Sequence, residues 1–134
     1  MDTETHRIES LLKNIFEGFE HLGLVYFFGS RATGDFGPLS DYDFGVYFTT
    51  KDKSEISRCR LLLFTEISRA LKSDSIDIVV LNIAESPELK YSIIAEGVVI
   101  FEREPFRVLI EPQILNEYFD FKESLKRYGL TKAL

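Results

Sequence analysis

Residues 27–34 read Phe27-Phe28-Gly29-Ser30-Arg31-Ala32-Thr33-Gly34, and residues 40–43 read Ser40-Asp41-Tyr42-Asp43. The first segment is the end of an apolar strand that runs into a Gly-Ser turn. The second segment places two aspartates one residue apart at the start of another apolar strand. This order of strand, glycine turn and paired acids outlines a metal-dependent phosphate site.

Hydrophobic periodicity predicts helices on both sides of this stretch. Apolar residues recur at helical spacing from Ile8 to Phe19, from a cap at Ser54 to about Lys72, and from Pro87 to a stop at Gly97. Near the end of the chain, Pro112 is expected to interrupt any helix that begins at Phe106, and a helix is expected again from Gln113.

Four short apolar runs predict strands over residues 24–28, 43–48, 76–81 and 98–101, the first of them buried on both faces. Residues 34–41 are rich in turn formers and predict a loop. Strands that alternate with helices favour an α/β (α+β) fold with a small mixed sheet flanked by helices. The length of 134 residues suits one domain over residues 1–134.

Composition narrows the class of protein. Sixteen lysines and arginines stand against 22 aspartates and glutamates, so the net charge is −6 and non-specific binding to nucleic acid is disfavoured. The single cysteine, Cys59, can form no internal disulfide, which fits a reducing compartment. No leader pattern and no apolar run of membrane-spanning length is present. We therefore expect a soluble, cytoplasmic protein.

Asp41 and Asp43 are the first candidate metal ligands. Side chains two residues apart in a strand leave the same face, so the two carboxylates can converge on one ion. Hard oxygen ligands suit Mg²⁺, which binds one or two carboxylates together with waters and substrate phosphates. The same pair is compatible with two ordinary carboxylates, Asp41 capping a turn and Asp43 ending a strand in solvent.

Asp77 is a charge set into the apolar run 76–81. A carboxylate buried there without a partner would be very costly. A metal shared with Asp41 and Asp43 on a neighbouring strand would remove that cost. An ion pair with an arginine, or a strand end that faces solvent, would do so equally well.

Gly29 and Ser30 are candidate phosphate ligands. A glycine turn after a buried strand lets backbone N–H groups and the serine hydroxyl approach phosphate oxygens closely. A plain strand-ending turn is the alternative. Arg31 is expected on the surface, at the start of a short helix, where it reaches a phosphate or pairs with an aspartate.

Taken together, Gly29-Ser30, ten intervening residues and Asp41-x-Asp43, with Asp77 on a later strand, closely resemble the DNA polymerase β-like nucleotidyltransferase superfamily. Among its branches the chain looks like the minimal nucleotidyltransferases, the MNT or MntA-type antitoxins that are often paired with a HEPN-domain partner. The segment 93–101, which reads Ile-Ile-Ala-Glu-Gly-Val-Val-Ile-Phe, also carries this likeness. The resemblance implies the fold of that superfamily.

The resemblance also implies a reaction and a set of roles. Two Mg²⁺ ions, about 3.5–4 Å apart in such sites, bridge the carboxylates and the nucleotide phosphates. Asp41 and Asp43 would hold both ions, and Asp77 would hold one of them. The resemblance also allows Asp77 to accept the proton of the incoming hydroxyl. Gly29 and Ser30 would grip the triphosphate, with Arg31 beside them. The implied reaction moves AMP from ATP to a hydroxyl and releases pyrophosphate.

For the acceptor, the likeness to the minimal nucleotidyltransferases implies a tyrosine of a HEPN-type toxin, held in a hetero-oligomer. Two alternatives stay open. The chain would act as an antitoxin by binding alone, or it would transfer the nucleotide to a small molecule of the antibiotic type.

Overall fold

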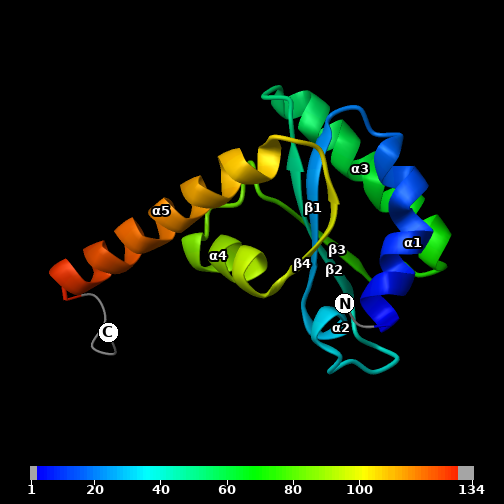
Figure 1. The fold of residues 1–134 in the computed structure, drawn as a ribbon, viewed down its shortest axis with the longest axis horizontal. Helices are drawn as coiled ribbons and strands as arrows, with labels where there is room; N and C mark the ends of the chain where they lie inside the picture. The colour runs from blue at the N-terminus through cyan, green and yellow to red at the C-terminus, as the bar shows by residue number, and fades with distance from the viewer. Residues whose placement is uncertain (1–2, 130–134) are drawn as a thin grey trace.

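The computed structural model describes residues 3–129. Nine elements follow one another along the chain (Figure 1). They are α1 Thr3–Glu17, β1 Leu22–Phe28, α2 Ser30–Thr33, β2 Tyr42–Phe48, α3 Lys53–Leu71, β3 Ile76–Val80, α4 Pro87–Glu96, β4 Val98–Glu102 and α5 Phe106–Arg127. The predicted helices and strands are all present. Apart from the last helix, which begins seven residues before the predicted Gln113, their ends differ from the predicted ones by up to five residues.

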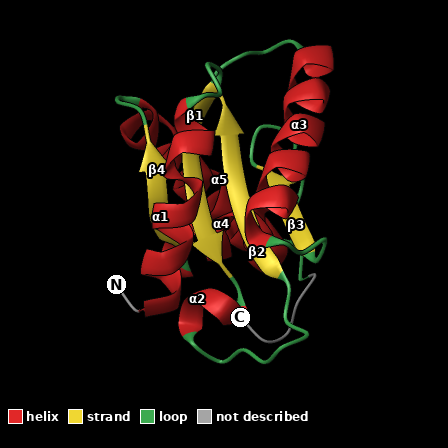
Figure 2. Cartoon of the chain, turned by 90° about the vertical axis from the view of Figure 1, so that its right-hand side faces the viewer, coloured by secondary structure: helices red, strands yellow, loops and turns green. Residues whose placement is uncertain are grey.

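The four strands form one sheet in the order β3-β2-β1-β4 (Figure 2). β1 pairs antiparallel with both β2 and β4, whereas β2 pairs parallel with β3. The predicted α/β class and the mixed sheet are therefore confirmed. β1 lies inside the sheet and buries six of its seven residues, as its continuous apolar sequence predicts.

Helices cover both faces of the sheet (Figure 1). On one face, α1 and α3 pack on the inward side chains of β1 and β2 around Phe16, Phe44 and Leu63. On the other face, α4 and α5 pack around Tyr26 and Ile93. Each fully buried side chain of this size stabilises the fold by roughly 1.5–3 kcal/mol. Successive residues of β2 alternate between the two faces, so Tyr42 and Phe44 face α1 and α3 while Asp43 faces the other way.

The helix caps follow the sequence with one correction. Ser86 caps α4, with Pro87 in the first turn and Gly97 at the end, as predicted. The predicted cap of α3 at Ser54 is wrong. Asp52 takes that role, because its carboxylate accepts the Ser54 N–H at 2.9 Å and the Glu55 N–H at 3.4 Å.

The predicted interruption at Pro112 is also wrong, since α5 is continuous from Phe106 to Arg127. Proline has no N–H to donate to the carbonyl four residues earlier, which here belongs to Val108. Val108 is 75% exposed, so water can bind that carbonyl. Ile110 and Ile114 are buried on either side of the proline and hold the helix against the sheet.

Replacing this proline should stabilise the protein. Pro112→Ala restores an N–H to the middle of α5, where proline costs about 3 kcal/mol relative to alanine. Because alanine also frees the unfolded chain, we expect a net gain of about 2 kcal/mol in the free energy of unfolding, measured in urea. Gln113→Ala, at the next exposed position, is the control and should change stability by no more than about 0.5 kcal/mol. A loss of stability in Pro112→Ala would contradict this account of α5.

Candidate active site

The sheet brings two of the predicted acids together. β2 and β3 run parallel with Asp43 opposite Asp77, so the two side chains leave the same face of neighbouring strands. Asp41 precedes β2 and is two residues from Asp43. All three acids lie at the end of the sheet nearest α2 (Figure 2).

Asp77 is not buried, which corrects the premise on which it was selected. β3 is an edge strand, and the Asp77 side chain is exposed. Of the arrangements left open by the sequence, a strand end that faces solvent is the one found. The register with Asp43, rather than burial, now connects Asp77 to the site.

Asp43 carries the electrostatic signature of the site. Burial and the nearby charges of Asp77 and Asp41 raise the pKa of the Asp43 carboxyl from 3.8 to about 6. Within residues 3–129, none of the three carboxylates forms an ion pair or a hydrogen bond with another side chain or the backbone. The acids therefore repel one another without a neutralising protein cation.

Gly29 forms the wall against which Asp43 lies. Its backbone has φ +80° and ψ −166°, and a Cβ atom added there would lie 2.1 Å from Asp43 Oδ2. Only glycine fits both the conformation and the space. Ser30, half-buried, is the first residue of α2, and its hydroxyl makes no hydrogen bond within the described part of the chain. The predicted short helix after the Gly-Ser turn is confirmed.

Arg31 lies elsewhere than predicted. It is only 7% exposed, and its guanidinium donates from Nη1 to Glu4 Oε2 at 2.9 Å and from Nε to the Ser40 carbonyl at 2.9 Å. The expectation of a surface arginine that reaches a phosphate or an aspartate is therefore corrected. Its carboxylate partner is a glutamate on α1.

The three carboxylates suit a hard cation whose other ligands come from water and substrate. Among the residues described, no three His, Cys, Asp or Glu side chains are arranged to hold a metal ion by themselves. The expected convergence of three acids on one ion is thus not formed by protein groups alone. Unpaired, mutually repelling carboxylates nevertheless suit Mg²⁺, whose remaining ligands are commonly waters and substrate phosphates.

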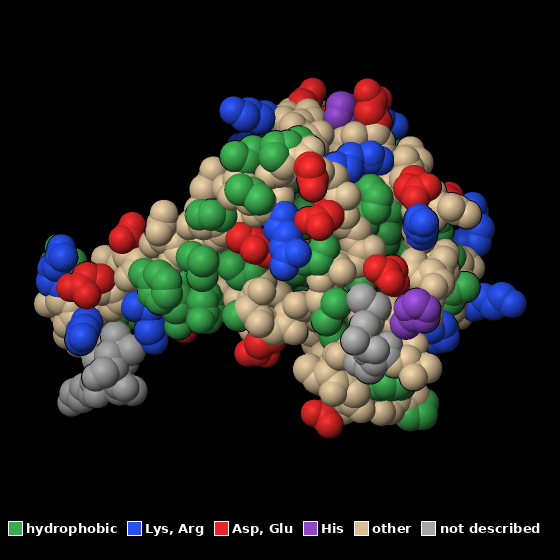
Figure 3. Space-filling model, in the orientation of Figure 1, with side chains coloured by type: hydrophobic (Ala, Val, Ile, Leu, Met, Phe, Trp, Pro, Cys, Tyr) green, Lys and Arg blue, Asp and Glu red, His purple; other side chains and the backbone are tan. Residues whose placement is uncertain are grey.

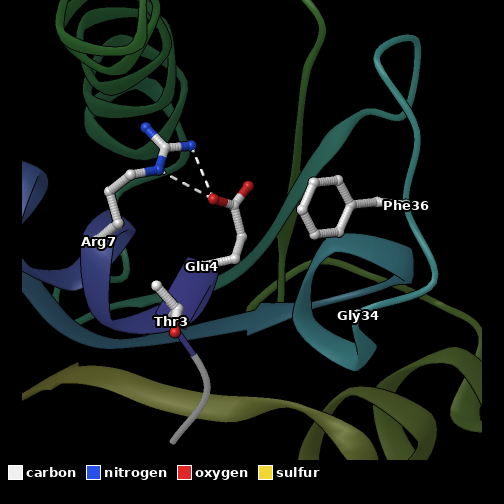
Figure 4. Close-up of a pocket in the computed structure, with 5 residues that line it drawn as sticks. All are labelled: Thr3, Glu4, Arg7, Gly34 and Phe36. Carbon is white, nitrogen blue, oxygen red and sulfur yellow. Dashed lines mark hydrogen bonds and ion pairs between the residues drawn. The ribbon is translucent and has the colours of Figure 1, made fainter.

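A hollow of about 400 Å³ lies between α1 and the residues that follow α2 (Figure 4). Thr3, Glu4, Arg7, Gly34 and Phe36 line it. Glu4 lies between Arg7 and Phe36, and none of the three aspartates reaches the hollow. We assign no ligand to this space.

Comparison with known protein families shows to which family the chain belongs. Residues 11–106 match the family described as Polymerase beta, Nucleotidyltransferase. The chain belongs to this nucleotidyltransferase family. The match spans the Gly-Ser turn and all three aspartates, so the resemblance predicted from the motif is confirmed. No protein among the curated sequences matches the chain.

Solved structures show the same fold over nearly the whole chain. A toxin–antitoxin crystallised with AMP-PNP is 25% identical to this nucleotidyltransferase, with a TM-score of 0.69, and covers 92% of this chain and 94% of that one. A tri-AMPylated HEPN toxin from Shewanella oneidensis in complex with an MNT antitoxin gives 23% identity and a TM-score of 0.60, with coverage of 93% and 92%. The MntA-HepT toxin–antitoxin gives 23% identity and a TM-score of 0.62, with the same coverage.

Sequence reasoning missed the neighbours of Arg31 in this nucleotidyltransferase. Glu4 is 27 residues away in the chain and precedes the helix predicted from Ile8, although it lies in α1. Tyr42 lies under the guanidinium at 3.9 Å from the ring centroid. The only signal for either contact was an arginine placed among turn formers, and that signal names no partner.

The raised pKa of Asp43 predicts an unusual pH dependence of stability. The folded chain holds the Asp43 proton up to about pH 6, whereas the unfolded chain releases it near the usual 3.8. Between these values the folded state binds more protons, so this group's contribution to the free energy of unfolding falls as the pH rises from about 4 to 6. Asp43→Asn should become more stable relative to the wild type as the pH rises from about 4 to 6, and this difference in the free energy of unfolding should level off at higher pH. Urea unfolding at several pH values measures this, and a constant difference would contradict it.

Proposed function

We propose that this nucleotidyltransferase moves AMP from ATP to the hydroxyl of a tyrosine on a HEPN-type toxin, and so acts as the antitoxin of the pair. The observation that carries the proposal is the parallel register of Asp43 with Asp77, beside Asp41 and against Gly29. The AMP-PNP complex and the AMPylated toxin among the structural relatives support the choice of nucleotide and acceptor.

In the proposed reaction the tyrosine oxygen bonds to the α-phosphorus of ATP. The bond from that phosphorus to the bridging oxygen of the β-phosphate breaks, and pyrophosphate leaves. The phenolic proton passes to the Asp77 carboxylate, which is exposed and therefore open to an incoming acceptor. Gly29 and Ser30 receive the triphosphate at the turn.

Asp41, Asp43 and Asp77 would hold Mg²⁺. When bound, the ion supplies positive charge to the phosphate oxygens and removes the repulsion that raises the pKa of Asp43. The carboxylates then serve to orient the triphosphate, because their own positions are set by adjacent strands of one sheet.

A protein acceptor suits the surface of the domain. Hydrophobic side chains gather over the α4 and α5 side of the molecule (Figure 3). On α5, Val108, Leu109 and Phe119 are 75%, 50% and 57% exposed. Tyr118 stacks on Tyr91 of α4 and so belongs to the packing between these helices. Exposed apolar surface of this kind marks sites of protein contact.

No helix in the described part of the chain meets the length and hydropathy of a membrane span.

The proposal is tested with the purified chain, Mg²⁺ and a purified HEPN-type toxin. ATP labelled at the α-phosphate should transfer label to a tyrosine of the partner, whereas ATP labelled at the γ-phosphate should not. Chelation of Mg²⁺ by EDTA should stop transfer. The Asp41→Asn/Asp43→Asn double variant should neither label nor neutralise the toxin.

Three outcomes would overturn parts of this proposal. Full neutralisation by the double variant without label would leave binding alone as the function. Label on a small hydroxyl compound and none on protein would identify a small-molecule nucleotidyltransferase. Equal use of every nucleoside triphosphate would remove the assignment of ATP.

A further inference from the structure

Arg31 joins the N-terminal helix to the loop that carries Asp41. Its guanidinium makes an ion pair with Glu4 of α1 and a hydrogen bond to the carbonyl of Ser40, both at 2.9 Å. It also lies over the rings of Tyr42 and Phe36, at 3.9 and 4.9 Å from their centroids. Three of these four contacts are therefore with residues 36–42.

The chemistry of the contact suits arginine and no other side chain. A planar guanidinium can donate in its plane to Glu4 and to Ser40 while its face covers an aromatic ring. The pair is shielded, with side-chain exposures of 9% for Arg31 and 12% for Glu4. A lysine ammonium retains the charge but lacks the fork that reaches two acceptors at once.

The loop has few other attachments. The Gly34 N–H donates to the Ser30 carbonyl at the end of α2. Over residues 35–40, the described hydrogen bonds other than that from Arg31 are internal, from the Ser40 N–H to the Gly37 carbonyl and from the Gly37 N–H to the Ser40 hydroxyl. Phe36 and Leu39 are 40% and 94% exposed, so apolar packing adds little. The bond from Arg31 to Ser40 is thus the loop's polar link to the rest of the protein, one residue before Asp41.

We propose that Arg31, held by Glu4, is a positioning residue that fixes the backbone at Ser40 and thereby the place of the Asp41 carboxylate. Only the expected effect of Arg31 on catalysis rests on the proposed function. The fixing of the loop is a property of the protein alone. In this role Arg31 acts through the Ser40 carbonyl and not through contact with the nucleotide.

The test compares Arg31→Gln with Arg7→Gln. Arg7 pairs with the same Glu4 at 2.8 Å and donates from Nη2 to the Tyr42 hydroxyl at 3.5 Å, but it makes no described bond to Ser40. It is therefore the matched control for the bond to Ser40. Hydrogen exchange followed by NMR reads the amides of Gly37 and Ser40 in the free protein. The Tyr42 amide, bonded to the Ser75 carbonyl, reports on the strand that follows.

Arg31→Gln should accelerate exchange at Gly37 and Ser40 by about tenfold, and it should raise the Mg²⁺ concentration for half-maximal transfer by about tenfold, the low end of outer-shell effects in metal sites. The KM for ATP at saturating Mg²⁺ should change little. Arg31→Lys should recover part of both effects, and Arg7→Gln should show neither. If Arg31→Gln does not fold, Arg31→Lys replaces it in the test. Arg31→Lys should show smaller increases in amide exchange at Gly37 and Ser40 and in the Mg²⁺ concentration for half-maximal transfer.

Unchanged exchange at Gly37 and Ser40 in Arg31→Gln, or equal acceleration in Arg7→Gln, would overturn the inference. A raised KM for ATP with unchanged exchange would instead make Arg31 a phosphate contact. Absence of nucleotidyl transfer in the wild type would defeat the proposed function, yet loop-confined acceleration would still establish the positioning role.

Discussion

Asp43→Asn is expected to abolish nucleotidyl transfer while making the folded protein more stable. The substitution keeps the size of the side chain and removes the charge that the site needs for metal and phosphate. We expect kcat/KM to fall by at least about 10³-fold, as for removal of a group that stabilises charge in the transition state. A partner-labelling assay with α-labelled ATP measures this loss.

The gain in stability has the same origin as the loss of activity. In the folded chain Asp43 is partly buried and faces the charges of Asp77 and Asp41, which raise its pKa to about 6. Such a shift corresponds to roughly 3 kcal/mol at neutral pH, and solvent screening of this partly exposed group reduces it to about 1 kcal/mol. Urea unfolding at pH 7.5 without metal should reveal the difference.

Asp35→Asn is the matched control for this prediction. Asp35 is an exposed acid in the loop after α2, and its neutralisation also removes one negative charge. We expect activity to be retained and stability to change by no more than about 0.5 kcal/mol. An Asp43→Asn protein that keeps a tenth of the activity, or that is less stable than the wild type, would show that Asp43 is an ordinary strand-end carboxylate.

Gly29→Ala should also cause a large loss of activity, through displacement of Asp43. The new Cβ atom would lie 2.1 Å from Asp43 Oδ2 and 3.0 Å from its Cγ, so the carboxylate must move. We expect transfer to fall by about 100-fold, the effect of misplacing a reacting group by roughly 1 Å. The positive φ adds strain of about 1–3 kcal/mol, which lowers the free energy of unfolding.

Gly34→Ala separates the clash from the strain. Gly34 has a similar φ of +91°, but an added Cβ meets no heavy atom within 4 Å. This variant should therefore lose about 1–2 kcal/mol of stability and keep its activity. Steady-state kinetics and thermal unfolding of both variants provide the comparison. Equal loss of activity in the two would mean that backbone strain in this region, rather than contact with Asp43, limits the reaction.

Local sequence was sufficient for the elements and for the family. The apolar run of β1 predicts a strand buried on both faces, and Ser86-Pro87 predicts the start of α4, because these signals depend on neighbours in the chain. The spacing from Gly29 to Asp43 identified the nucleotidyltransferase family for the same reason. The turn and both strands that carry this motif lie within 27 consecutive residues, 22–48.

Features that depend on the order of elements in space were not available from the sequence. The apolar neighbours of Asp77 favoured burial and left a solvent-facing strand end as an alternative. β3 lies at the edge of the sheet and leaves the carboxylate in solvent, so the alternative is the one found. Pro112 was predicted to break α5, but buried residues on either side hold the helix while Val108 stays open to water.

The sequence by itself determined which acids and which glycine make the candidate site, since the chemistry of phosphate and metal binding restricts the residue types and their spacing. Only the tertiary structure decided what holds that site. Asp43 meets Asp77 through the parallel pairing of β2 with β3, and Arg31 meets Glu4 from a helix 27 residues away. Contacts across such distances are set by how the layers pack, which no local pattern of residues encodes.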